Sequence, residues 1–411
     1  MTVSGRGVDC VVVGADPAGL VLALLLARHG RRVTVLDRGP EHRRRLAGIS
    51  PFLSPAALAV LRRLGLSDAL LAAGRPVRRV VEHPRHGRPY VLAYDRAPDT
   101  PFPFALSVPQ LTLQHLLHTA LRAQPTARVE PDTLPLADVT ETRGGQVRLH
   151  RRHGAPITAR AVVCADGPFS RTRRLAGIEA DVTAVDRPVA MVHLPLPAHW
   201  PDQITAHHVD GDGLVTTIPL AGDRLIVQCL VAADALRRLR TQPVDRLLGR
   251  LTAVLPELHD PLARQVTSWD RVSLVQHHVV RPRAWTRGNL VLLGDAAHGV
   301  HSFAGQGLSL AVQDAVVLAA RLLDAGPGTV PAALCGYERA RRPFTERFQT
   351  YQLSLPQLTS TPVTPPRRFP VYAPLADVMV TGQPEVHALL PRLVPATPPR
   401  VTGDAAHTGP A

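Results

Sequence analysis

Residues 289–314 read NLVLLGDAAHGVHSFAGQGLSLAVQD, in which an apolar run, an acid, a glycine-rich turn and a second apolar run follow one another. The run 289–293 is short and rich in Leu and Val, which predicts a buried β-strand. Asp295 follows it, at the end of the strand where a carboxylate can accept hydrogen bonds from the hydroxyl groups of a ligand. Gly305 and Gly307 then precede an apolar helix. Because a helix N-terminus offers free N–H groups and a partial positive charge, this order predicts a cradle for a cofactor.

The N-terminal region carries a second pattern of the same kind. Val8–Val13 is a β-branched run, the turn at residues 14–19 reads GADPAG, and an apolar helix follows. A second strand is expected at residues 32–36, and Asp37 closes it. This is the pattern of a dinucleotide-binding βαβ unit, in which the terminal acid binds the ribose hydroxyls of adenosine.

Asp16 departs from the usual glycine pattern of such units, G-x-G-x-x-G, because it takes the place of the middle glycine. That position is normally bare so that the backbone can approach a pyrophosphate. A carboxylate there adds a charge repulsion of about 1–4 kcal/mol at the effective dielectrics of protein surfaces. Since Asp tolerates unusual backbone angles, we expect the turn to form and the affinity for the cofactor to be reduced.

A third segment, CADGPFSRTR at residues 164–173, follows a Val-rich run. An Asp-Gly pair alone is a common turn. Taken with GDAAH at 294–298, GQG at 305–307 and QD at 313–314, however, it resembles the motifs of FAD-dependent aromatic hydroxylases and epoxidases. These are the single-component flavin monooxygenases of the p-hydroxybenzoate hydroxylase type.

The resemblance implies an α/β fold with a Rossmann-like FAD-binding domain, an inserted antiparallel-sheet substrate domain and C-terminal helices. The implied FAD-binding domain is discontinuous and comprises residues 1–73, 98–180 and 282–351. The substrate domain comprises residues 74–97 and 181–281, where alternating runs predict a hairpin at 77–94 and further short strands. Residues 352–411 form a Pro-rich extension, and we expect its end, residues 396–411, to be disordered.

The resemblance also implies which residues contact the flavin. The residue at the position of Asp295 binds the ribityl chain, the helix that starts near Gly305 faces the pyrimidine edge of the isoalloxazine, and Asp166 contacts the pyrophosphate and serves NAD(P)H. The cluster 43–45 is either a solvated loop or, through Arg45, a flavin contact. The full set of expected FAD contacts is Gly14, Ala15, Asp16, Ala18, Gly19, Asp37, Arg38, Arg45, Gln110, Asp166, Gly294, Asp295, Gly305, Gly307 and Leu308. No residue is assigned as catalytic, and a histidine at the position of His298 is structural more often than catalytic.

The function that the resemblance implies is an FAD-dependent monooxygenase, which consumes NAD(P)H and O₂ to hydroxylate or epoxidise an apolar metabolite, for example of polyketide type. Ser302 stands where the family usually has Pro, and Ser309 stands where it usually has Asn. Two alternatives stay open. The same fold could serve a non-redox cyclase or isomerase, with flavin absent or only structural, or a scaffold without catalysis.

Composition excludes other classes of function. All 47 basic residues are Arg, so neither a Schiff-base lysine nor a P-loop lysine is available. Although the net charge is +14, the arginines are scattered and aromatic residues make up only 4%, so we expect no nucleic-acid partner.

The remaining signals concern cysteines, histidines and membranes. The four cysteines are far apart, which favours reduced thiols in a cytoplasmic protein. The His pairs at 207–208 and 277–278 lie in expected strands, where neighbours point to opposite faces, so we expect no metal site. The apolar run 18–27 is too short to cross a bilayer, and we expect no membrane span.

Overall fold

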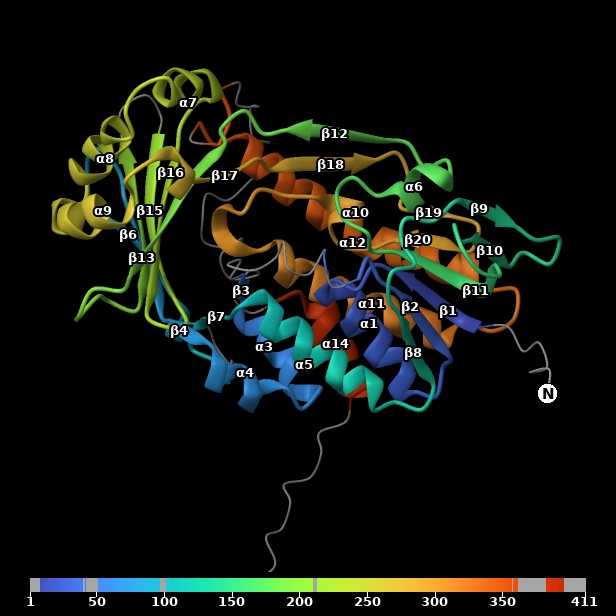
Figure 1. Ribbon diagram of the computed structural model, residues 1–411. Helices are drawn as coiled ribbons and strands as arrows, with labels where there is room; N and C mark the ends of the chain where they lie inside the picture. The colour runs from blue at the N-terminus through green and yellow to red at the C-terminus, as the bar shows by residue number, and fades with distance from the viewer. Residues whose placement is uncertain are drawn as a thin grey trace, which may run out of the picture.

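The structure of the protein is a computed structural model, and it describes residues 8–39, 41, 51–96, 101–209, 213–356, 358–360 and 382–394. Two expectations fall outside these ranges, namely the flavin contact of Arg45 and the disorder of residues 396–411. The α/β fold class is confirmed, with one sheet in each half of the molecule (Figure 1).

The larger half is built on an eight-stranded sheet. Its main path is β19 (Thr286–Arg287), β20 (Leu290–Leu292), β11 (Ile157–Cys164), β1 (Val8–Val13), β2 (Val33–Leu36) and β8 (Ala127–Glu130), with β10 (Val147–His150) and β9 (Asp138–Glu141) at the side of β11. The pairs from β20 to β8 are parallel, so the carboxyl ends of β1, β2, β11 and β20 meet at one edge. β8 was not predicted, because the sequence ARVE carries two charges in four residues.

Two apolar helices fill the core beside this sheet. These are α1 (Pro17–Arg28) and α11 (Gly307–Asp324), which pack against each other and are buried over most of their length. By length and composition, the segment Phe303–Asp324 could cross a membrane, but 72% of it is buried inside the protein, as in the core helix of a globular fold. The helices α3 (Pro55–Arg63), α4 (Ser67–Ala73), α5 (Gln110–Arg122) and α12 (Val330–Leu353) complete this half. Ser54 caps α3, because its hydroxyl accepts a hydrogen bond from the backbone N–H of Ala57.

The smaller half is a seven-stranded sheet at the other end of the molecule (Figure 1). Its order is β17 (Ser273–Val275), β13 (Val189–Pro195), β16 (Arg224–Leu230), β15 (Gly213–Leu220), β14 (Gln203–Val209), β5 (Arg79–His83) and β6 (Tyr90–Ala93). The predicted hairpin is confirmed as β5 and β6. Within the described part of this sheet, the pairs are antiparallel except for β5 with β14, which come from separate segments of the chain and run parallel.

One face of the seven-stranded sheet is covered by short helices. The covering elements are α7 (Ala233–Arg240), α8 (Asp245–Thr252), η2 (Pro256–Leu258), α9 (His259–Gln265) and η3 (Trp269–Arg271). Their leucines pack on outward-facing side chains of β13, β15 and β16. The neighbouring helices α7 and α9 were not predicted from the sequence. The opposite face of the sheet looks toward α11 and the eight-stranded sheet (Figure 1).

Two small sheets join the halves. β12 (Ala180–Ala184) pairs with β18 (His278–Pro282), and β7 (Ala105–Ser107) pairs with both β3 (Phe52–Leu53) and β4 (Arg75–Val77). These strands are only two to five residues long and were not predicted, since so short a run carries too little periodicity.

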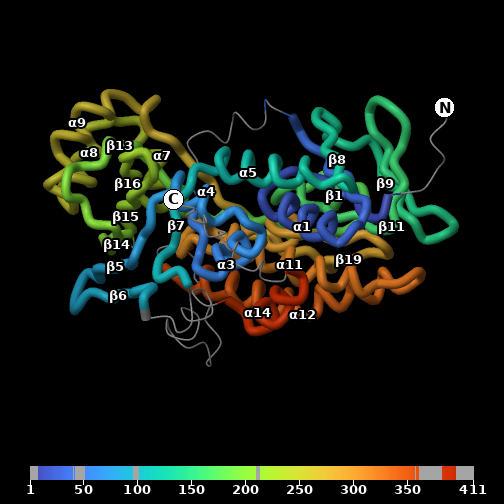
Figure 2. The backbone as a smooth tube through the Cα atoms, turned by 90° about the horizontal axis from the view of Figure 1, so that it is seen from below, coloured from blue at the N-terminus to red at the C-terminus, as the bar shows by residue number. Residues whose placement is uncertain are grey.

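The C-terminal extension contributes a helix that was not predicted, α14 (Pro384–Leu393), which packs on α11 (Figure 2). Its last residues are tied to the first half of the chain. The Leu393 carbonyl lies 2.7 Å from Nε2 of His29, and the Val394 carbonyl accepts a hydrogen bond of 3.0 Å from Arg63. Although the surrounding sequence is rich in proline, α14 is therefore an ordered helix packed against the core.

Candidate functional site

The turn between β1 and α1 brings the backbone very close to β11. Gly14 has φ +114°, and a Cβ atom built there would lie 2.2 Å from the carbonyl oxygen of Ala165. A Cβ at Gly19 would lie 2.6 Å from the carbonyl oxygen of Gly14. Only glycine fits at either position, so α1 begins directly over the carboxyl end of β1 and points its N-terminus into the space at the sheet edge.

The predicted site residues of the N-terminal βαβ unit and of segment 164–173 line one cavity at this edge. Together with its mouth the cavity measures about 270 Å³. Its lining residues are Gly14, Ala15, Asp16, Asp37, Arg38, Gln114 and Asp166. The ends of β1, β2 and β11 thus meet in space, although β11 is separated from the other two strands by more than a hundred residues of the chain.

The stretch 289–314 lines an adjoining groove of about 650 Å³. Of the predicted residues, Asp16, Ala18, Gln110, Gly294, Asp295, Gly307 and Leu308 line it. Asp16 borders both spaces, so they form one elongated groove across the carboxyl ends of the strands. Gly19 lies behind this surface and Gly305 lies at the far end of the groove, in the wall of a third space described below.

Asp16 stands at the middle of the groove with an ordinary backbone conformation, φ −73° and ψ 159°. The tolerance of Asp for unusual angles, which was invoked from the sequence, is therefore not needed. Its Oδ1 accepts a hydrogen bond of 3.4 Å from Nε2 of Gln114. Burial and the neighbouring carboxylate of Asp295 raise the pKa of Asp16 to about 6, against the opposing effect of Arg38.

Asp166 uses its side chain mainly within its own turn. Its carboxylate accepts hydrogen bonds from the Ser170 hydroxyl and from the backbone N–H and hydroxyl of Thr172, the latter two at 3.1 and 3.0 Å. Ser170 in turn caps α6 (Arg171–Leu175). The backbone carbonyl of Asp166 accepts a hydrogen bond of 2.6 Å from Arg38. The Asp-Gly motif is thus a rigid turn tied to the end of β2.

Asp295 opens α10 (Asp295–His298), directly after Gly294, which has φ +61°. The carboxylate faces the groove, where the surrounding protein raises its pKa by desolvation while His298 lowers it. A Cβ at position 294 would lie 3.3 Å from Cβ of Ala311, so the glycine lets β20 end close against α11.

Beneath the groove, three buried side chains join α10, α11 and α12. The Asp314 carboxylate accepts hydrogen bonds from Nε2 of His298 and, at 2.6 Å, from Nε of Arg341. Arg341 also donates to the side-chain carbonyl of Gln383. Burial acts to raise the pKa of Asp314, but the charges and hydrogen bonds of Arg341 and His298 outweigh it and hold the pKa below the ordinary value. His298 is therefore a structural residue, as the resemblance implied.

Segment 301–303 is held by Gln352 of α12. The Gln352 side chain accepts a hydrogen bond from the backbone N–H of His301 and donates to the carbonyls of His301 and Phe303, at 2.9 to 3.0 Å. The imidazole ring of His301 takes no part in these hydrogen bonds to Gln352. Its Nδ1 instead accepts a hydrogen bond of 2.9 Å from the backbone N–H of Phe303, so the proton of the neutral ring sits on Nε2. Desolvation lowers the pKa of His301 well below its ordinary value, which keeps the ring neutral.

We expect Gln352→Leu to destabilise the protein by about 2–4 kcal/mol, because it leaves three buried backbone groups of residues 301 and 303 without partners. Thermal unfolding measures this loss. Gln124→Leu is the matched control, since the Gln124 amide makes only a marginal bond of 3.4 Å to the carbonyl of Ala120 within its own helix end. Equal melting temperatures of the two variants would contradict the assigned role of Gln352.

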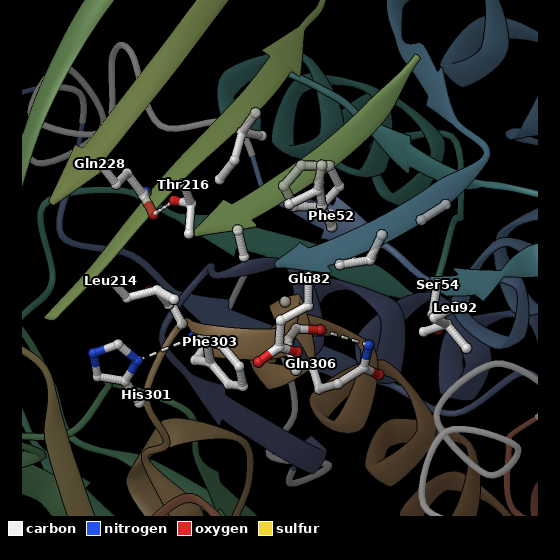
Figure 3. Close-up of a pocket in the computed structure, with 18 of the residues that line it drawn as sticks. Phe52, Ser54, Glu82, Leu92, Leu214, Thr216, Gln228, His301, Phe303 and Gln306 are labelled. Carbon is white, nitrogen blue, oxygen red and sulfur yellow. Dashed lines mark hydrogen bonds between the residues drawn. The ribbon is translucent and has the colours of Figure 1, made fainter. Parts of the chain in front are cut away.

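A third space lies between segment 301–306 and the seven-stranded sheet (Figure 3). Together with its mouth it measures about 1200 Å³, and its walls are largely apolar. Alternate residues of the sheet face it, among them Leu214, Thr216 and Ile218 of β15 and Gln228 and Leu230 of β16. Gly305 and Gln306 line this cavity while Gly307 lines the groove, so a single turn, which begins within η4 (Phe303–Gly305), separates the two spaces. We call this turn, residues 304–307, the partition.

Comparison with known proteins agrees with this geometry. Residues 7–351 match the family described as FAD binding domain. The chain belongs to the FAD-dependent aromatic hydroxylases. Protoasukamycin 4-monooxygenase of Streptomyces nodosus subsp. asukaensis is 32% identical over 400 residues, which cover 94% of this chain and 96% of that protein. 6-Methylpretetramide 4-monooxygenase of Streptomyces rimosus is 30% identical over 410 residues, covering 95% and 92%.

Solved structures show the same fold. The structure of PqsL of P. aeruginosa in complex with 2-aminobenzoylacetate superposes with a TM-score of 0.75 at 23% identity, covering 87% of this chain and 98% of that one. This aromatic hydroxylase is therefore a flavin-dependent monooxygenase, with FAD as cofactor and NAD(P)H as co-substrate.

The groove of this aromatic hydroxylase fits FAD. At Gly14 a side chain would collide with the carbonyl of Ala165, which keeps the groove open beside the backbone, and the N-termini of α1 and α11 both open onto the groove. Two buried side-chain carbonyls, of Gln114 and Gln306, have no hydrogen-bond partner within the described residues and lie at the edges of the groove system. Hydrogen-bond donors of a ligand would satisfy them.

Sequence reasoning missed several residues of this hydroxylase. Gln114 was overlooked although it lies one helical turn after Gln110, on the same face of α5, a spacing that could have identified it. Ser309, noted as a departure from the family, accepts a hydrogen bond of 3.0 Å from the backbone N–H of Ser54 and so links α11 to the start of α3. Arg341 and Gln352 carried no signal, because their partners are distant in the chain.

Proposed function

We propose that this monooxygenase hydroxylates an uncharged aromatic or polyene ring system of the polyketide type. The observation that carries the proposal is the large apolar cavity that adjoins the groove across the single turn at residues 304–307. Two relatives that cover almost the whole chain are named as monooxygenases of protoasukamycin and of 6-methylpretetramide, which supports the same substrate class here. We propose a cytoplasmic location, in line with three buried free thiols and one exposed one among the cysteines.

We further propose the following contacts with FAD. Asp37 binds the adenosine ribose, the N-terminus of α1 with Gly14 and Ala15 faces the pyrophosphate, and Asp295 binds the ribityl chain. The N-terminus of α11 at Gly307 and Leu308 faces the pyrimidine edge of the isoalloxazine. Residues 1–73, 98–180 and 282–351 would then form the flavin-binding domain, and residues 74–97 and 181–281 the substrate domain.

The chemistry is divided between cofactor and protein. When bound, FAD would be reduced by NAD(P)H and would then activate O₂. The protein would hold the organic substrate against the apolar sheet, and the partition and the sheet would keep water away from it. The partial positive charge at the N-terminus of α11 would stabilise the negative charge of a reduced flavin.

Absorbance spectroscopy of the purified protein tests the proposal. We expect a yellow protein whose oxidation of NAD(P)H is stimulated by an apolar aromatic substrate. A colourless protein that does not bind added FAD but still converts a polyene would overturn it in favour of the cyclase, which the names of the relatives do not favour.

Asp295→Ala is expected to lower the FAD content of the purified protein by about tenfold or more, because a charge-assisted hydrogen bond is worth about 1.5–3 kcal/mol. The ratio of flavin to protein absorbance measures it. Asp324→Ala, which removes a carboxylate from an exposed ion pair with Arg392, serves as the control and should leave that ratio unchanged. Retention of full flavin content by Asp295→Ala would contradict the assignment of Asp295.

A further inference from the structure

The large cavity contains one carboxylate among its described lining residues, that of Glu82. Glu82 lies on β5, where its side chain is on the inner face of the sheet beside Val80 and Ala206. Its residue is only 9% exposed, so the charge sits in a largely apolar wall rather than in bulk water. Figure 3 shows the side chain descending from the sheet toward Phe303 and Gln306, that is, toward the partition.

One oxygen of this carboxylate is engaged and the other is not. Oε1 of Glu82 lies 2.5 Å from Nε2 of His208, which is on the neighbouring strand β14. Oε2 has no hydrogen-bond partner among the residues that the structure describes. His208 fixes the orientation of the carboxyl group, and the second oxygen is left with acceptor capacity in the cavity. This oxygen opens onto the cavity, where it can accept a hydrogen bond from water or, when a ligand displaces that water, from a donor group of the ligand.

The charge of the cavity favours some substrates over others. No arginine lines the described part of the cavity, and the chain contains no lysine. A substrate carboxylate placed there would meet Glu82 in a medium of low dielectric without a compensating cation, which is strongly unfavourable. A hydroxyl or amino group, in contrast, can donate a hydrogen bond to Oε2.

We infer that Glu82, positioned by His208, is the specificity-determining residue of the cavity. It accepts a hydrogen bond from a hydroxyl or amino group on a neutral aromatic substrate and excludes substrates that carry a carboxylate near that group. The inference rests on the proposed function, because it assigns the large cavity to the substrate. The contact also fixes which edge of the ring faces the partition at Gly305.

Three probes that share the naphthalene ring and differ in one small substituent test the inference, namely 2-naphthol, 2-methoxynaphthalene and 2-naphthoate. Their fluorescence reports binding directly, and perturbation of the flavin absorbance gives a second readout. We expect the wild-type protein to bind 2-naphthol about tenfold or more tightly than 2-methoxynaphthalene, which has no donor, and 2-naphthoate most weakly. Tight binding of 2-naphthoate would overturn the inference.

Two variants of Glu82 separate its charge from its acceptor. Glu82→Gln keeps the size and a carbonyl acceptor, and we expect it to bind 2-naphthoate at least about tenfold better than the wild type does. Glu82→Leu removes the acceptor as well, and we expect it to bind 2-naphthol and 2-methoxynaphthalene alike. A purely structural role would change neither ratio, and unchanged ratios in both variants would overturn the inference.

Glu385→Gln is the matched control, because it removes the same charge from a surface ion pair with Arg321 and should leave all three affinities as in the wild type. If Glu82→Leu fails to fold, the 2-naphthoate affinity of Glu82→Gln decides alone. Probe fluorescence does not require flavin, so a protein that shows the expected ratios but no NAD(P)H oxidation contradicts the proposed function and leaves the assignment of Glu82 intact.

Discussion

Replacement of Arg341 by leucine is expected to lower the free energy of unfolding by about 3–5 kcal/mol. Arg341 and Asp314 are both fully buried, and their ion pair is joined to His298. Removal of the guanidinium leaves the carboxylate of Asp314 in the core without its cation. Because the three residues join α10, α11 and α12 beneath the groove, we expect a lower affinity for FAD in addition to the loss of stability.

Denaturant or thermal unfolding of single and double variants measures this effect. We expect Arg341→Leu and Asp314→Asn each to be strongly destabilising, and the double variant to lose less than the sum of the two, since neither charge is then unpaired. Arg392→Leu, which breaks an exposed pair with Asp324, is the control and should cost about 0–1 kcal/mol. Additive losses, or an Arg341→Leu variant as stable as the control, would contradict the account.

The ion pair of Asp314 and Arg341 should also make the stability of the protein depend on pH. The pKa of Asp314 is lowered in the folded protein, so its contribution to stability is fully present above the ordinary value of 3.8 and is lost as the pH falls through the lowered pKa. Acid unfolding of the wild type should accordingly show a steeper loss of stability below that value than acid unfolding of Asp314→Asn.

Asp16→Gly is expected to tighten FAD binding by about fivefold to several hundredfold at pH 8. A carboxylate near the pyrophosphate costs about 1–4 kcal/mol, and each 1.4 kcal/mol is a factor of about ten in affinity. Asp16 has φ −73° and caps no backbone group of α1, so glycine can replace it without rebuilding the turn. Titration of the flavin-free protein with FAD, followed by flavin fluorescence, measures the dissociation constant.

The pH dependence distinguishes charge from bulk. The raised pKa of Asp16, about 6, means that the carboxyl group becomes neutral as the pH falls from 8 to 5. FAD affinity of the wild type should therefore rise over this range, whereas the affinity of Asp16→Gly and of the isosteric Asp16→Asn should change less. If Asp16→Asn binds FAD no better than the wild type at pH 8 while Asp16→Gly does, the effect is steric and the electrostatic account is wrong.

The sequence predicted those parts of the fold that consist of long or strongly patterned runs. β1, β11 and α11 are apolar over most of their length, and β15 and β16 alternate, so their existence followed from local pattern. α14 escaped prediction because its Pro-rich surroundings indicate disorder, whereas its helix is stabilised by packing on α11. β8 and the two- and three-residue strands depend on partners that the sequence does not reveal.

The candidate site divides in the same way. Gly14, Asp37 and Asp295 were predicted because strand ends and glycine turns leave a signal at fixed spacing. Glu82 was not, since its importance comes from the cavity that β5 shares with strands more than a hundred residues further along the chain and from its contact with His208. Residues whose role depends on tertiary contacts cannot be recognised until the topology places them together.

Because β15 and β16 are pleated, neighbouring residues of each strand face opposite sides of the sheet. Val215, Val227 and Cys229 anchor the sheet to the leucines of α7–α9, whereas neighbouring residues such as Thr216 and Gln228 form the ceiling of the large cavity. Exchange of the ceiling residues alone would reshape the reaction chamber while the anchoring side stays intact. Under the proposed function, changing every second residue of these two strands would therefore alter which substrates fit without changing any residue of the groove.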